Sequence, residues 1–126
     1  MNRLWLFALV VCLTPAFVSL AADWPQWRGP MRDGIIRESK LPAAWPPQPP
    51  APKWQISVGI GYSSPVVANG QLFIQGREGA NETCLSFDSA TGKPLWKVAY
   101  PSTFEPPDPT AGKGPNSTPT VDGDRV

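Results

Sequence analysis

Proline is the residue type that most constrains the fold of this chain. Of its 17 prolines, six lie within residues 42–52, and only two lie within residues 53–100. Proline interrupts helix interiors and central strands, because its φ is fixed and it has no N–H to donate. This pattern excludes a helical bundle and predicts regular structure only after residue 52. Residues 23–52 are predicted to be an extended, irregular arm rich in Pro and Trp.

The charge balance narrows the classes of function. The chain holds 11 Lys and Arg against 10 Asp and Glu, so its formal net charge is +1, and it contains no His. A nucleic-acid-binding protein normally carries a basic patch, so we expect no nucleic-acid partner. The lack of His removes the commonest metal ligand and general base. The hydrophobic content of 41% is too high for a disordered tail.

The first 22 residues have the pattern of a secretory signal peptide. Arg3 precedes an uncharged apolar run, Leu4–Leu13, and Ser19-Leu20-Ala21 is a small-x-small cleavage site. The run is too short to cross a bilayer, which needs about 20 apolar residues. We expect cleavage after Ala21 or Ala22, a periplasmic or secreted location, and no membrane span afterwards. An uncleaved membrane anchor is the alternative.

The dipeptide Asn69-Gly70 predicts a β-hairpin. It separates two apolar runs, residues 65–68 and 71–75. A type I′ turn needs positive φ at both central residues, which Asn and Gly tolerate best. Three tryptophans of the preceding arm are expected to pack against a neighbouring part of the protein, with a sugar- or peptide-binding aromatic patch as the alternative: Trp24, Trp27 and Trp45.

Two further strands follow the hairpin. Residues 83–87 and 95–99 have strand composition, and Asp88–Lys93 between them is rich in side chains that hydrogen-bond to nearby backbone. We therefore expect four antiparallel strands in residues 64–100 and an all-β fold. Residues 53–58, which include Trp54, alternate large apolar with polar residues and predict one more strand.

These elements recur along the chain. Trp54 and its strand match Trp96 and its strand 42 residues later, and the Ser64–Val67 stretch matches Thr118–Val121 54 residues later. The 12 extra residues (54 minus 42) fall in a Pro- and Gly-rich insertion, residues 101–116. Four strands in a period near 40 are typical of a β-propeller blade. Residues 117–126 are then the start of a second blade.

The stretch from Ser86 to Trp96 resembles the repeat of pyrroloquinoline-quinone-like (PQQ-like) β-propellers, roughly Ala-x-Asp-x-x-Thr-Gly-x-x-x-Trp. Asp88, Thr91, Gly92 and Trp96 match it, whereas Ser86 replaces the usual Ala. The leader Asp23–Pro30 is similar to the start of secreted planctomycete-type propellers. The resemblance implies that residues 53–126 are the N-terminal part of a longer ring, with a first blade at 64–100. Its structural motif residues are Asp88, Thr91, Gly92, Trp96, Trp54, Asn69 and Gly70.

In such rings the N-terminus often supplies the outermost strand of the last blade, so residues 53–58 are expected to close the ring. The resemblance implies a binding or scaffold module that holds no cofactor, with a protein or small ligand at the propeller loops. The loop at 101–116, with Phe104, is the candidate specificity element, and a solvated insertion without a binding role is the favoured alternative. No catalytic or metal-ligating residue is predicted, and the cofactor-binding residues are unknown.

The alternative is a quinoprotein dehydrogenase that oxidises alcohols or sugars with pyrroloquinoline quinone and Ca2+. Such enzymes need a carboxylate base and oxygen ligands for the metal, and commonly carry adjacent cysteines. This chain has no Cys-Cys pair, and several of its acids are scattered: Asp33, Glu38, Glu78, Glu82 and Asp108. Three arginines of the arm, Arg28, Arg32 and Arg37, are expected to make only a weak anion-binding patch, because acids interleave with them.

Overall fold

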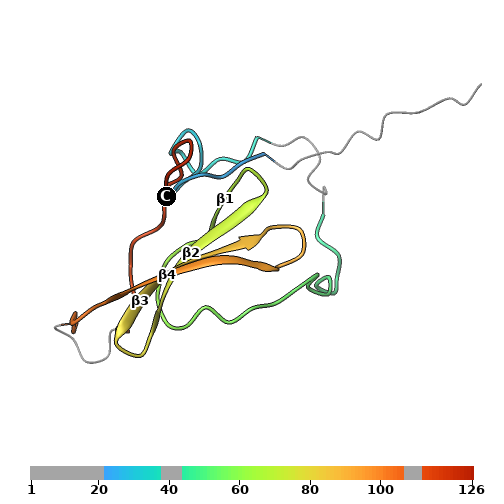
Figure 1. Cartoon of the computed structure of the whole chain (residues 1–126). Coiled ribbons are helices and arrows are strands. Elements are labelled where there is room, and N and C mark those ends of the chain that lie inside the picture. Colours follow the sequence, from blue (N-terminus) through green and yellow to red (C-terminus); the bar gives the residue numbers. More distant parts are fainter. Residues whose placement is uncertain (1–21, 38–43, 107–111) are drawn as a thin grey trace, which may run out of the picture.

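The protein forms one open antiparallel sheet, seen in a computed structural model that describes residues 22–37, 44–106 and 112–126 (Figure 1). The sheet is a meander in the order β1 (Val66–Ala68), β2 (Gln71–Glu78), β3 (Asn81–Asp88) and β4 (Pro94–Pro101). No helix occurs within the described ranges. The predicted all-β fold and the four-stranded antiparallel unit are therefore confirmed. The predicted signal peptide, apart from Ala22, lies outside these ranges, as do Glu38 and Asp108.

The hairpin between β1 and β2 has the predicted turn. Asn69 and Gly70 have φ values of 52° and 74°, as a type I′ turn requires. Strands β2 and β3 are longer than the pattern predicted, and they meet at a second turn, Gly79-Ala80, where Gly79 has φ 58°. Arg77 and Glu78 are charged, so the apolar pattern that predicted this strand ends before them, although β2 continues to Glu78.

Both faces of the sheet carry apolar side chains. The first, which we call the Phe73 face, holds the core residues Val66, Ala68 and Phe73, and Val121 packs against them. The ring centroids of Phe73 and Trp96 lie 5.8 Å apart on this face. The second, the Phe87 face, holds buried Leu85 and Phe87. A sheet that is apolar on both sides is expected to be covered on both sides.

Strand β4 is the exposed edge of this sheet. All eight of its residues are exposed, including four large apolar or aromatic side chains, Leu95, Trp96, Val98 and Tyr100. The edge also carries Lys97, which pairs with Glu78. A charged Lys on an edge strand disfavours uncontrolled pairing with other chains.

Residues 53–58 form no strand with the described part of the chain, and their role as a closing strand paired with the last blade of a ring stays a prediction. An extended segment becomes a strand only through hydrogen bonds to a neighbour, and within the described part of the chain none pairs with this stretch. The segment instead approaches the Phe87 face. A Cβ on Gly76 would lie 1.9 Å from the carbonyl oxygen of Val58. The backbone then pairs with β2 through Ile60 and Arg77, at 3.1 and 2.8 Å.

The two ends of the described chain meet beside β1. Trp24 forms an antiparallel bridge with Val67, and the amide of Val121 donates to the carbonyl of Pro25 at 2.8 Å. Figure 1 shows the early blue segment and the late red segment together at this end of the sheet. Residues 117–126 contain no strand and only one bridge, Asp122 with Arg125, around Gly123.

Candidate functional site

The turn between β3 and β4 forms a seat for a tryptophan. The ring of Trp54 lies against Gly92, where an added Cβ would be 2.8 Å from Cδ2 of the indole. The indole Nε1–H donates to the carbonyl oxygen of Ser89 at 3.2 Å. The buried Gly92 has φ 72°, so both its backbone conformation and the space above it require glycine. We call Ser89 and Gly92 the tryptophan seat.

Hydrogen bonds inside the turn give the seat its shape. The carboxylate oxygen Oδ1 of Asp88 accepts from the Thr91 amide at 2.8 Å and from its hydroxyl at 2.7 Å. These two bonds from Thr91 hold the pKa of Asp88 below its usual range. The amide of Ser89 donates to the carbonyl of Gly70 at 3.0 Å, so the two turns support each other.

The structure therefore gathers most of the motif residues predicted from the sequence. Asp88, Thr91 and Gly92 build the turn, Trp54 fills it, and the turn at Asn69-Gly70 touches it through the Gly70 carbonyl. Trp96 is the exception, because its ring packs with Phe73 on the Phe73 face. The pairing of Trp54 with Gly92 is a long-range contact that composition and periodicity did not predict.

One hollow lies on each face of the sheet. A cavity of about 200 Å³ on the Phe73 face is bordered by Phe73, Trp96, Val121 and Val126. A groove of about 340 Å³ on the Phe87 face is bordered by Leu85, Phe87 and Leu95, with Ser57 and the Lys97–Glu78 pair at its rim. Trp96 borders both hollows. The groove on the Phe87 face has a mainly apolar lining, as expected where other parts of a protein pack, whereas the cavity on the Phe73 face is also bordered by the polar residues Asn69, Gln71 and Arg125.

An arginine that sequence reasoning missed organises the opposite end of the sheet. Arg77 is only 6% exposed. Its guanidinium donates to four backbone carbonyls, those of Gly79, Ser102, Phe104 and Lys113, at 2.8–3.2 Å. It thereby fixes both described ends of the predicted specificity loop. The sequence offered no clear signal for this role, because Arg77 lies beyond the predicted strand at 71–75 and its partners are backbone atoms.

The loop also has an ion pair and an aromatic contact. Lys113 pairs with Glu105 at 2.7 Å and lowers the pKa of that carboxylate. The hydroxyl of Tyr62 accepts from the amide of Gly112 at 3.0 Å. Phe104, the candidate specificity residue, is half exposed, and its backbone carbonyl accepts a hydrogen bond from Arg77.

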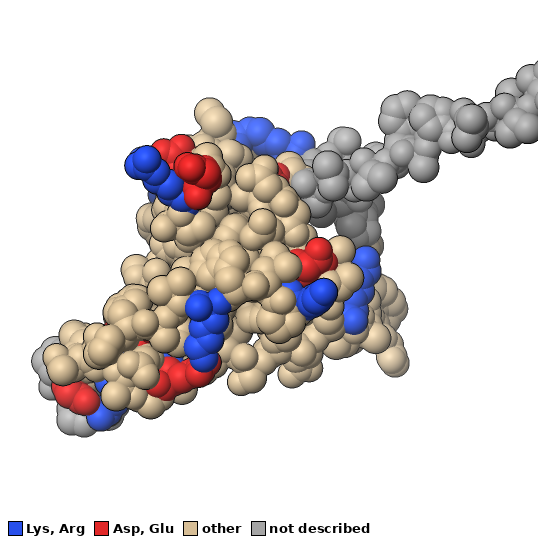
Figure 2. Space-filling model, in the orientation of Figure 1, with Lys and Arg blue, Asp and Glu red and all other residues tan. Residues whose placement is uncertain are grey.

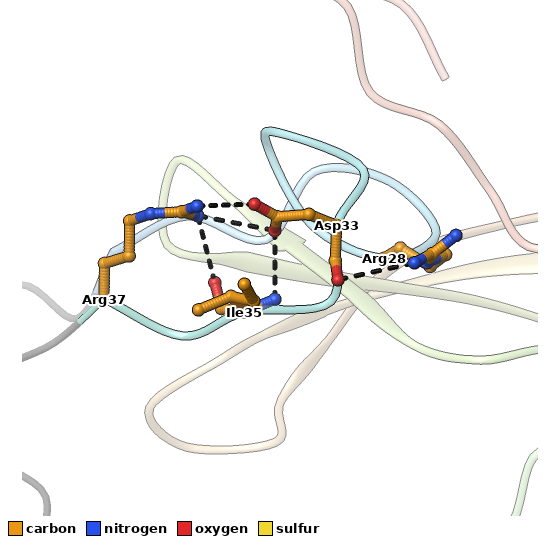
Figure 3. Close-up of polar contacts among 4 residues, drawn as sticks. All are labelled: Arg28, Asp33, Ile35 and Arg37. Atoms are coloured by element: carbon orange, nitrogen blue, oxygen red, sulfur yellow. Dashed lines mark hydrogen bonds and ion pairs between the residues drawn. The ribbon is translucent and has the colours of Figure 1, made fainter.

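The arginines of the N-terminal arm are used within the arm (Figure 3). Arg37 forms an ion pair with Asp33, whose carboxylate also accepts from the amide of Ile35. These contacts lower the pKa of Asp33 to about 2, with the Arg37 hydrogen bond the largest cause. Arg28 donates to the Asp33 carbonyl and stacks over Trp27, and Arg32 donates to the side chain of Gln26. Only the charge of Arg37 is therefore paired with a carboxylate, while Arg28 and Arg32 donate to neutral groups.

Packing of the arm tryptophans follows the prediction only in part. Trp24 is partly buried, and its ring lies against Gly29. Trp27 and Trp45 are 63% and 78% exposed, contrary to the prediction that all three pack. Each lies in a turn or proline-rich stretch that offers little apolar surface of its own.

Charges on the visible face of the molecule lie in small mixed groups (Figure 2). The acids in the described ranges form no cluster with Cys or His that could hold a metal ion. A helix long and apolar enough to cross a membrane is likewise not found in residues 22–37, 44–106 and 112–126. No family model matches the sequence, and neither a curated protein nor a solved structure matches it.

Proposed function

We propose that this chain carries the first blade of a PQQ-like β-propeller, and that it serves as a secreted or periplasmic binding or scaffold module without catalysis. The observation that carries the proposal is the contact of Trp54 with the seat at Ser89 and Gly92. Trp54 stands one repeat before Trp96 in the sequence alignment of the two repeats. A tryptophan of one repeat therefore packs on the glycine turn of the next.

The position of Trp96 supports the same arrangement. Its ring leaves the seat of its own blade free for Trp54 and borders a cavity with Val121 and Val126, which belong to the following repeat. Trp54 thus packs on the proposed repeat that follows it, and Trp96, at the equivalent position, borders a cavity with the repeat that follows its own. In repeat proteins each unit contacts only its neighbours, and these contacts supply much of the stability.

The apolar surface of the sheet also supports a stacked role. The groove on the Phe87 face and the exposed side chains of β4 leave apolar area uncovered on both sides. A single four-stranded sheet cannot bury two apolar faces by itself, whereas neighbouring blades bury both. The loop held by Arg77 then lies at one end of the blade, where propellers carry binding loops.

The seat is tested by removing the tryptophan. We expect Trp54→Ala to lower the free energy of unfolding of the 126-residue chain by about 1–3 kcal/mol, because it removes a partly buried indole and its hydrogen bond. Trp45→Ala is the matched control, since Trp45 is 78% exposed and its loss should cost less than about 0.5 kcal/mol. Equal losses in the two variants, measured by denaturant unfolding, would contradict the proposal.

The absence of catalysis is tested with the cofactor of the alternative enzyme. Pyrroloquinoline quinone and Ca2+ are added to the full-length propeller that contains this blade, and quinone absorbance and Tm are followed. The proposal expects no saturable spectral change and no increase in Tm. A saturable, Ca2+-dependent quinone spectrum would support the quinoprotein alternative instead.

Secretion is tested by N-terminal sequencing of the chain recovered from the periplasm of a bacterial host. We expect the mature protein to begin at Ala22 or Asp23, with the uncleaved chain absent from that fraction. Recovery of the intact chain in the membrane fraction would instead support the anchor.

A further inference from the structure

The edge of β1 that faces away from β2 is already occupied. Val67 donates its amide to the Trp24 carbonyl at 3.0 Å and accepts from the Trp24 amide at 2.7 Å. Both carboxylate oxygens of Asp23 lie 3.2 Å from the amide of Asn69 in the adjoining turn. Two consecutive arm residues thus satisfy the backbone donors and acceptor that an added strand would use.

The next arm residue, Pro25, reaches the following repeat. The carbonyl of Pro25 accepts from the amide of Val121 at 2.8 Å, and the side chain of Val121 packs on the core of the Phe73 face. Residues 23–25 therefore hydrogen-bond on one side to β1 and on the other to the segment after the loop. Either bond alone would attach residues 23–25 to only one segment, whereas the two together link β1 to the following repeat.

Trp24 has a dedicated place within the arm. A Cβ on Gly29 would lie 2.7–2.8 Å from three carbons of the Trp24 ring. Gly29 is buried and has φ 77°, so the turn after Trp24 folds its backbone directly onto the indole. The amide of Gly29 donates to Gln26 and that of Arg32 donates to Gly29. Trp24 thus packs against a turn of the arm through its ring and bonds to β1 through its backbone.

We propose that Asp23–Pro25 form a clasp that joins the innermost strand of this blade to the start of the next repeat and closes the β1 edge to other strands. This assignment rests on the proposed function, in which β4 is the outermost strand of the blade and β1 therefore lines the central channel. In that ring the clasp brings residues 26–37 to the channel. A ligand that enters the channel at this blade would meet that loop rather than an open strand edge.

Amide exchange tests the joining role. In the 126-residue chain, Trp24→Ala should raise the exchange rates of the Val67 and Val121 amides together by about tenfold or more, because both donate to the clasp. Gly29→Ala should do the same, since its Cβ displaces the indole from the other side. The matched control is Trp27→Ala, which removes an exposed arm indole and should leave both rates within about twofold. Unchanged Val121 exchange in both clasp variants, or an equal effect of the control, would overturn the proposal.

Peptide binding tests the closing role. A fluorescent peptide of residues 22–31 is titrated into the wild type and into Trp24→Ala, and anisotropy is measured. We expect saturable binding only to the variant, whose β1 edge is vacated. Equal binding to both proteins, or binding to neither, would contradict closure of the edge.

The clasp and the proposed ring can fail separately. If Trp54→Ala has no effect on unfolding while the clasp variants behave as expected, the propeller proposal is contradicted and the clasp remains as a contact within this chain. If the clasp variants leave amide exchange and peptide binding unchanged while Trp54→Ala destabilises the chain as expected, only the clasp proposal is contradicted.

Discussion

The ring of Trp54 rests directly on the α-carbon of Gly92, with no room for a side chain between them. An added Cβ would lie 2.8 Å from Cδ2 of the indole and 2.9 Å from Cγ. The two residues are 38 positions apart in the sequence, so this contact positions the segment around Trp54 against the β3–β4 turn. This position requires glycine for two separate reasons: its φ is positive, and the indole leaves no space for a Cβ.

Gly92→Ala should therefore cost more than an ordinary glycine substitution. We expect a loss of about 2–4 kcal/mol in the free energy of unfolding, from backbone strain together with displacement of the indole. Gly70→Ala is the matched control, because Gly70 has a similar φ of 74° with nothing within 4 Å of the added Cβ. It should cost only about 1–2 kcal/mol. Denaturant unfolding that shows equal losses would mean that the indole contributes nothing at Gly92.

The elements that followed from the sequence are those with local causes. The Asn69-Gly70 turn and the Asp88–Lys93 turn depend on neighbouring residues only, and both are present with the expected φ values and hydrogen bonds. The predicted strand at 53–58 depended on a partner strand, and alternation of side chains cannot supply one. The contacts of Trp54 and Arg77 join residues far apart in the chain, which a single sequence does not reveal.

Two aspartates should titrate below their usual range, and each depends on a different partner. Arg37→Met should raise the pKa of Asp33 from about 2 toward its ordinary value of 3.8, although the Ile35 amide still bonds to it. Thr91→Val should raise the pKa of Asp88, since the hydroxyl and amide of Thr91 are the largest causes of its lowering. Side-chain NMR titration measures both. Each variant controls for the other, and a shift of both aspartates in one variant would contradict separate local causes.

The same two aspartates determine how the stability of the folded chain changes at low pH. Their pKa values are lower in the folded chain than in the unfolded chain, so protonation favours unfolding. Their contribution is complete above about pH 4, near the unfolded value. It is lost as the pH falls through the folded values, to about 2 for Asp33. Wild-type Tm should decline over this window, and the decline should be smaller in the double variant Arg37→Met/Thr91→Val. An identical pH dependence of Tm in the wild type and the double variant would show that these groups do not contribute.

Arg77→Met should release the loop from the sheet. The substitution keeps the apolar stem and removes all four hydrogen bonds to backbone carbonyls. We expect a loss of about 2–4 kcal/mol in unfolding free energy and faster limited proteolysis at residues 102–106. Lys97→Met is the control, because the Lys97–Glu78 pair is about half exposed and such pairs contribute less than about 1 kcal/mol. Equal proteolysis of the two variants would show that Arg77 does not hold the loop.

Val98 offers a test of the apolar edge strand. Val98 is 57% exposed and lies two positions from Trp96 and two from Tyr100, on the same face of β4. This exposed apolar row should drive concentration-dependent association of the 126-residue chain, because no described part of the chain covers it. Val98→Glu should lower the average mass measured by sedimentation velocity, since association would bury an unpaired carboxylate. Ala90→Glu adds the same charge in the exposed turn, and we expect it to leave the mass unchanged. If both variants lower the mass equally, net charge rather than the β4 face controls association, and the blade would not need neighbours on that side.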